Sequence, residues 1–217
     1  MCVPGHGAPI CTLAFFAIAV FAQQWSALAE CMSFDRAGIV AGEYWRLLTG
    51  HFTHWNNDHL TWDVLMFVLL GSLIERRSRA CLGLVVYPSA AVISAAIWFA
   101  QPGIQRYRGL SGVDSALFAF AALMLYDEID VGRQKLPRKL LALLAAAFAL
   151  KVLWEIATGA TLFVDSSAAG FTPLPLAHAV GGCVGVAVWW ATRRSGLDIR
   201  PHSTDGHFVD YPAMVDS

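Results

Sequence analysis

Charged residues are scarce in this chain of 217 residues, and their scarcity narrows the class of protein. Only 14% of the residues are charged and 57% are hydrophobic, with a mean hydropathy of +0.54. A soluble domain carries about 25% charged residues. The formal net charge is −1, so the chain lacks the basic excess that attracts nucleic acid. The composition favours a membrane protein with no nucleic-acid partner.

Paired cysteines and metal-binding motifs are also missing. The five cysteines are scattered, with no Cys-x-x-Cys pair: Cys2, Cys11, Cys31, Cys81 and Cys183. We therefore expect small apolar packing residues rather than a disulfide framework or a zinc ribbon. The His-Glu-x-x-His motif of zinc proteases does not occur either, and we expect no cofactor.

Long apolar runs are what the sequence does have. Six of them approach the roughly 20 residues that cross a bilayer as a helix. They lie at 9–29, 60–74, 80–100, 110–126, 137–157 and 174–192. Because backbone groups in lipid must be hydrogen-bonded internally, continuous runs of this kind indicate helices. We expect an all-α membrane protein with six transmembrane helices, in which the short and polar second and fourth spans are buried among the others.

The first span needs a separate test, because Ala27-Leu28-Ala29 resembles a signal-peptidase site. The stretch before it, residues 1–9, contains no Lys or Arg, which argues against a cleaved signal. The first span is therefore expected to be a retained helix.

Basic residues divide unequally between the two ends of the predicted spans. One end would hold Arg76, Arg77, Arg79, Arg133, Lys135, Arg138, Lys139, Arg193, Arg194 and Arg200, and the other only Arg36, Arg46, Arg106 and Arg108. The more basic side is expected to face the cytoplasm, with both termini inside and residues 30–57 outside. We expect one membrane domain over 1–195 and a short polar cytoplasmic tail over 196–217.

A serine between glycines opens the fourth span, in Gly109-Leu110-Ser111-Gly112. Glycines permit a tight turn and close backbone approach, and a helix N-terminus offers free N–H groups to a developing oxyanion. Gly and Ser are also ordinary packing residues of membrane helices, so this tetrapeptide alone is a weak signal.

His178 lies in the sixth span and strengthens a catalytic interpretation. Ionisable side chains within a membrane usually face a partner or a water-filled cavity. Gly181 and Gly185 would let another helix approach closely. If that helix is the fourth, His178 can take the proton of Ser111 and activate it. A structural histidine bonded to a backbone carbonyl is an equal alternative from this segment alone.

A third polar cluster contains His51, His54, His59 and Asp63. Such a set invites a metal site. However, the cluster lies at the predicted outer mouth, where polar residues are ordinary. Metal binding is therefore an alternative that we do not prefer.

Taken in order, these segments resemble the rhomboid family of intramembrane serine proteases. The resemblance covers roughly residues 43–190 and runs through Glu43-Tyr44-Trp45-Arg46-Leu47-Leu48-Thr49, His51, His54, His59, Glu75-Arg76-Arg77, Gly109-Leu110-Ser111-Gly112 and Ala177-His178 with Gly181 and Gly185. Each motif is weak, but the ordered combination is specific.

The resemblance implies a mechanism and a class of substrate. Ser111 would be the nucleophile and His178 the general base, as a dyad without a third carboxylate. His59 and the Ser111 backbone N–H would form the oxyanion hole, and Trp45-Arg46 would pack at the membrane edge. Substrates would be single-span membrane proteins cut near the outer face of the bilayer. The short chain and the start of the fourth span resemble the rhombosortase-like branch, which implies glycine-rich C-terminal anchors as substrates.

Two positions depart from the family pattern. Asp63 stands where many members have Asn, and an ionised carboxylate there would repel an oxyanion. Either Asp63 is protonated and donates a hydrogen bond, or it is ionised, turned away and orients His59. Ser115 replaces a common Tyr, with Asp114 beside it.

Two further classes of function remain open. A non-catalytic relative would bind membrane segments without cutting them, although it would not need Ser111, His178 and His59 together. A transporter or channel would line a path with these polar groups. The sequence shows neither paired broken helices nor an inverted repeat, which weakens that alternative.

Overall fold

The computed structural model describes residues 8–130, 132, 135–159 and 174–195. In chain order its elements are α1 (Ile10–Gln24), α2 (Ser26–Met32), β1 (Phe34–Asp35), α3 (Arg36–Val40), α4 (Arg46–Thr49), η1 (Gly50–Phe52), α5 (Asn57–Glu75), α6 (Arg79–Ala100), β2 (Arg106–Tyr107), α7 (Ser111–Asp130), α8 (Arg138–Thr158) and α10 (Pro175–Arg194). The predicted tail over 196–217 lies outside the described residues. The helical class is confirmed, with one two-stranded ribbon added.

The first predicted span, 9–29, is interrupted near its end. The helix stops at Gln24, and Trp25 adopts an extended conformation with φ −122° and ψ 105°. The chain then turns by 119° into α2. The other five predicted spans agree with α5, α6, α7, α8 and α10 to within a few residues. Apolar residues resume after the turn, so the prediction joined the two helices into one span, although Gln23, Gln24 and Ser26 at the break are polar.

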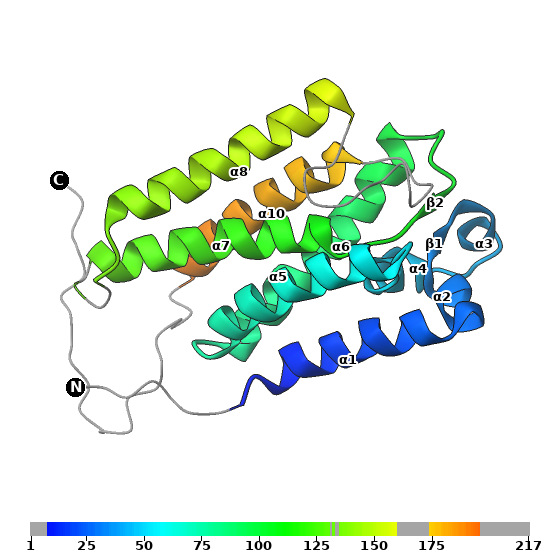
Figure 1. Ribbon diagram of the computed structural model, residues 1–217, viewed down its shortest axis with the longest axis horizontal. Helices are drawn as coiled ribbons and strands as arrows, with labels where there is room; N and C mark the ends of the chain where they lie inside the picture. Colours follow the sequence, from blue (N-terminus) through cyan, green and yellow to red (C-terminus); the bar gives the residue numbers. More distant parts are fainter. Residues whose placement is uncertain (1–7, 131, 133–134, 160–173, 196–217) are drawn as a thin grey trace.

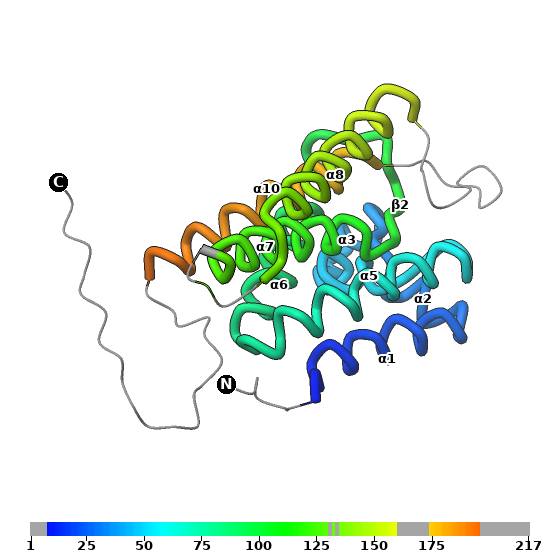
Figure 2. Tube along the Cα trace, turned by 60° about the vertical axis from the view of Figure 1, so that its left-hand side comes forward, coloured from blue at the N-terminus to red at the C-terminus, as the bar shows by residue number. Residues whose placement is uncertain are grey.

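The helices form a stacked bundle with α7 inside it. Figures 1 and 2 show α1 and α5 on one side of α7 and α8 on the other, with α10 beside α7. Nearly the whole first half of α7 is buried, including Val113, Ala116, Leu117 and Phe120. The prediction that the fourth span is enclosed by its neighbours is therefore confirmed.

The six-span count is not confirmed in full. Among the described residues, α6, α8 and α10 are long and apolar enough to cross a membrane, and α1 with α2 adds a fourth if the bent pair is counted as one span. Helices α5 and α7 fall outside this group because both carry acidic side chains, such as Asp63 and Asp114. The structure thus agrees with an integral membrane protein whose polar helices are covered by apolar ones.

Small residues let α7 and α10 approach to backbone contact. A Cβ added at Gly181 would lie 1.9 Å from the Gly112 carbonyl oxygen, and one added at Gly185 would lie 2.2 Å from that of Ala116. Both helices begin at the same end of the bundle (Figure 1). The two glycines therefore bring the first turn of α10 alongside the first turns of α7, as expected from their spacing.

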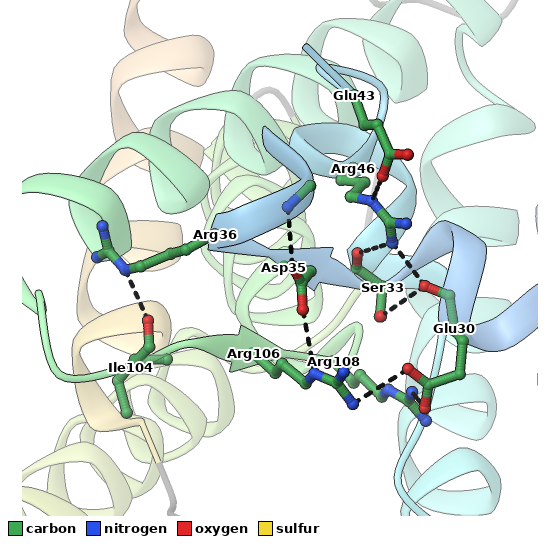
Figure 3. A network of polar contacts seen from close by, with 10 residues as sticks. Glu30, Ser33, Asp35, Arg36, Glu43, Arg46, Ile104, Arg106 and Arg108 are labelled. Carbon is green, nitrogen blue, oxygen red and sulfur yellow. Dashed lines mark hydrogen bonds and ion pairs between the residues drawn. The ribbon is translucent and has the colours of Figure 1, made fainter. Parts of the chain in front are cut away.

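Arginines hold the end of the bundle where β1 and β2 lie (Figure 3). The Arg36 guanidinium donates to the carbonyl oxygens of Ile97, Trp98 and Gln101 at 2.9–3.0 Å, which satisfies the C-terminus of α6. Arg106 bridges to Asp35 at 3.1 Å beside the strand pair. This network fixes the segment that leads into α7.

The opposite end of the bundle has its own polar contacts. Arg77 of α5 pairs with Glu128 of α7 at 2.6 and 3.0 Å. Glu75 accepts the backbone N–H of Cys11 and Thr12, and so caps the start of α1. The described arginines of the two predicted sides therefore lie at opposite ends of the bundle.

Candidate functional site

Ser111 is the first residue of α7 and is half-buried. The chain reaches it from β2 through Gly109, whose φ of +129° favours glycine. A Cβ on Gly109 would lie 2.8 Å from the His59 ring, so a side chain is also excluded by contact. The Tyr107 hydroxyl donates to the Gly109 carbonyl at 3.2 Å and lies next to the Ser111 side chain. Both the backbone conformation and the lack of space for a side chain therefore favour glycine at position 109.

Asp63 lies at the centre of the contacts on one side of Ser111. Its Oδ2 accepts the backbone N–H of Leu110 at 2.8 Å and that of Ser111 at 3.1 Å. The Nε2 atoms of His54 and His59 lie 3.3 and 3.2 Å from the same oxygen. One carboxylate oxygen therefore faces four nitrogen atoms.

This arrangement bears on both interpretations of Asp63. The Ser111 N–H and His59, which the resemblance implied as oxyanion donors, both face the Asp63 carboxylate. The carboxylate is thus not turned away from those donors, as the ionised alternative assumed. Its Oδ2 acts as an acceptor, and its contact with His59 agrees with an orienting role.

His178 lies in the first turn of α10 and is buried. Its neighbour Ala177 contacts the position where a Cβ of Gly112 would stand, at 3.3 Å. Because Gly112 follows Ser111 and Ala177 precedes His178, the two predicted catalytic residues belong to helix turns that are in direct contact.

The sequence analysis did not identify Glu155, which comes from the last turn of α8. Its Oε2 lies 2.6 Å from His178 Nδ1, and the residue is 1% exposed. Lys151, one turn earlier, places Nζ 2.8 Å from Glu155 Oε1 and 3.3 Å from His178 Nδ1. The resemblance implied a dyad without a third carboxylate, yet a carboxylate lies beside the histidine. The signal in the sequence was an acid and a base four residues apart in an otherwise apolar helix.

The two unusual residues after Ser111 occupy different surroundings. Ser115 donates from Oγ to the Ser111 carbonyl oxygen at 2.8 Å, which is a bond within the helix. Asp114 is buried, and its Oδ1 has no hydrogen-bond partner among the described residues. We have no physical account of Asp114.

His51, in η1, and His54, in the loop that follows it, are buried. His51 Nε2 lies 3.0 Å from the Ala90 carbonyl oxygen and 3.1 Å from Ser94 Oγ. Burial lowers the pKa of His51 to about 4 and also lowers the pKa of His54. Both rings are therefore neutral at physiological pH. Within the described ranges no group of three or more His, Cys, Asp and Glu side chains is arranged to hold a metal ion.

A comparison with protein families agrees with this geometry. The family model described as the Rhomboid domain matches residues 41–195, which is most of the chain and includes every residue of the site described above. The match shows that the chain belongs to the rhomboid family, which comprises intramembrane serine proteases together with some inactive members.

Proposed function

We propose that this protein is an active intramembrane serine endopeptidase, with Ser111 as nucleophile and His178 as general base. Ser111 Oγ would attack the substrate carbonyl carbon while its proton passes to His178 Nε2. The imidazolium would then protonate the departing amine, and a water activated by the same nitrogen would release the acyl group. No metal or cofactor is required by this reaction.

One observation carries the proposal. Gly112 and Gly181 are in backbone contact, which brings the turns bearing Ser111 and His178 together at one end of the bundle. A serine at a helix start, on a turn that contacts the turn of a buried histidine from a second helix, suits an activated nucleophile. An inactive family member would have no chemical need to keep a serine and a histidine on turns in contact.

The oxyanion would form on the side of Ser111 where Asp63 now lies. The backbone N–H groups of Leu110 and Ser111 converge on Asp63 Oδ2, with His59 nearby. N–H groups that hydrogen-bond a carboxylate oxygen can also hydrogen-bond the oxyanion of a tetrahedral intermediate. We infer that Asp63 occupies the oxyanion position in the resting protein and yields it to the substrate carbonyl oxygen.

The substrates we propose are single-span membrane proteins cut near the outer face of the bilayer. A peptide bond within an intact helix is not accessible, so residues that weaken helices, such as glycine, favour cleavage. Glycine-rich C-terminal anchors fit this requirement. We further propose a bacterial inner membrane, with the termini in the cytoplasm and the arginine network of Figure 3 outside.

A serine-reactive fluorophosphonate probe tests the proposal in native membranes. The wild-type protein should label, whereas Ser111→Ala and His178→Ala should not. Ser26→Ala is the matched control because Ser26 is exposed at the start of α2, and this variant should label like the wild type. Equal labelling of all four proteins, or none while a known rhomboid protease labels, would favour a non-catalytic protein that binds membrane segments.

A further inference from the structure

Glu155 lies against Nδ1 of His178, which leaves Nε2 as the nitrogen that acts as general base in the proposed mechanism. The distance of 2.6 Å between Glu155 Oε2 and His178 Nδ1 is short even for a hydrogen bond with a charged acceptor. Glu155 is 1% exposed and His178 is 6% exposed, so water does not compete for this contact. The pair joins the last turn of α8 to the first turn of α10.

Lys151 restricts where the proton of this contact can lie. Its ammonium group only donates hydrogen bonds, and it lies 2.8 Å from the other oxygen of Glu155. If His178 Nδ1 carried no proton, its lone pair would face a carboxylate lone pair at 2.6 Å, which is repulsive. Lys151 Nζ also lies near Nδ1, but at the longer distance of 3.3 Å, so the arrangement that satisfies the closer neighbour has Nδ1 protonated and donating to Glu155. In a neutral imidazole this leaves the Nε2 lone pair free to accept a proton.

We propose that Glu155 is a positioning residue that extends the catalytic pair to Ser111–His178–Glu155. Glu155 holds the tautomer and orientation of His178 and stabilises the imidazolium formed when Ser111 attacks. In that step the Oγ–H bond breaks, the Nε2–H and Oγ–carbon bonds form, and the Nδ1 proton stays on His178. The inference rests on the proposed function, since a positioning residue has a role only beside a working base.

A purely structural ion pair is the competing explanation. Most of α8 is exposed on the described bundle, and its buried residues are Leu141, Val152 and Glu155. A charged residue within a membrane helix is costly unless it has a partner. Lys151 is such a partner, four residues away on the same helix. A structural pair would be complete without His178, whereas the contact with His178 is the shorter of the two.

The kinetics of fluorophosphonate labelling test the role of Glu155. In Glu155→Gln we expect the maximal labelling rate to fall by about 10²–10⁴-fold, as when the carboxylate of a serine-protease triad becomes an amide. The half-saturating probe concentration should change by less than roughly twofold, because the lost interaction belongs to the transition state. Removing the carboxylate should also move the acid limb of the pH–rate profile to lower pH. Glu155→Asp keeps the charge and should recover part of the rate.

Glu75→Gln is the matched control. Glu75 is the other buried glutamate of the described residues, and it caps α1 at the far end of the bundle. This variant should lose thermal stability in detergent while keeping the wild-type pH profile. The inference is overturned if Glu155→Gln labels like the wild type, or if Glu155→Gln and Glu75→Gln lose rate in parallel with stability and without a shift of the acid limb.

A spectroscopic measurement separates this inference from the proposed function. Nitrogen-15 NMR of labelled histidine in the Ser111→Ala protein reports the tautomer of His178 without any turnover, and His178→Ala assigns the signal. We expect a protonated Nδ1 that changes in Glu155→Gln. If the wild-type protein fails to label while this tautomer is observed, the proposed protease activity is ruled out and the Glu155 contact still stands. An unprotonated Nδ1 would overturn the inference whether or not the wild type labels.

Discussion

Two histidine–carboxylate contacts flank Ser111, and they differ in how each carboxylate is satisfied. On the base side, Glu155 lies 2.6 Å from His178, and its second oxygen bonds Lys151. On the oxyanion side, Asp63 lies 3.2 Å from His59, and the same oxygen accepts two backbone N–H groups, those of Leu110 and Ser111. Both carboxylates are buried. Similar side chains are thus placed in unlike surroundings.

The difference shows that the effect of a buried carboxylate on a neighbouring site depends on its other hydrogen-bond partners. Glu155 is neutralised by a lysine side chain, which leaves the backbone around Ser111 untouched. Asp63 is compensated by the N–H groups that a tetrahedral intermediate would need. In the proposed mechanism the first arrangement would support attack by Ser111, whereas the second would oppose it until the carboxylate gives way. Three changes to the chain would break or sharpen this contrast.

The largest effect is expected from Gly181→Ala, on the base side. The new Cβ would lie 1.9 Å from the Gly112 carbonyl oxygen, so α7 and α10 must separate. A displacement of about 1 Å between reacting groups costs on the order of 10²-fold in rate. The fluorophosphonate labelling rate should fall by about that factor. Gly182→Ala is the control, because its Cβ would meet only the Phe148 ring at 3.4 Å and should be tolerated. Equal behaviour of the two variants would contradict the packing argument.

Gly109→Ala acts on the oxyanion side. It forces a side chain into a backbone with φ of +129° and against the His59 ring at 2.8 Å. We expect a loss of about 1–3 kcal/mol in the free energy of unfolding, measured by thermal or denaturant unfolding in detergent. Gly103→Ala, where a Cβ meets nothing within 4 Å, should change little. A similar loss in both variants would mean that the strain at Gly109 is not the cause.

Asp63→Asn tests whether the carboxylate blocks the oxyanion donors. A neutral amide oxygen accepts hydrogen bonds about half as strongly as a carboxylate, so the N–H groups should be released more easily. We expect the labelling rate to rise by about tenfold, which corresponds to roughly 1.4 kcal/mol. A large decrease, with normal thermal stability, would instead mean that Asp63 contributes to catalysis as a carboxylate, because an amide could replace a protonated acid as a hydrogen-bond donor.

The pH dependence of stability should reveal the lowered pKa of His51, a residue that belongs to neither contact. Burial lowers its pKa from 6.5 to about 4, so between these values the unfolded chain binds a proton that the folded protein excludes. Stability is therefore fully present above pH 6.5 and is lost as the pH falls toward 4, by about 1 kcal/mol per pH unit. Thermal unfolding in detergent between pH 7 and 4.5 measures this slope. His51→Gln should flatten it, and an unchanged slope would assign it to other groups.

The sequence by itself determined the class of the protein, most of its helices and the family. Continuous apolar runs require helices in lipid, whatever they pack against, so five of the six predicted spans agree with the structure to within a few residues. The spacing of Gly181 and Gly185 likewise predicted a close helix contact. These features are local or periodic, and a single sequence displays them directly.

Only the tertiary structure decided the surroundings of the site. The turn at Trp25 has no proline or glycine to mark it, only the polar residues Gln23, Gln24 and Ser26. The contact of Glu155 with His178 joins residues from two helices, and the convergence of Leu110 and Ser111 on Asp63 joins α5 to the start of α7. Which buried charges meet depends on the rotation and depth of each helix in the bundle. Those two quantities are set by packing between helices, and no single segment of the sequence carries them.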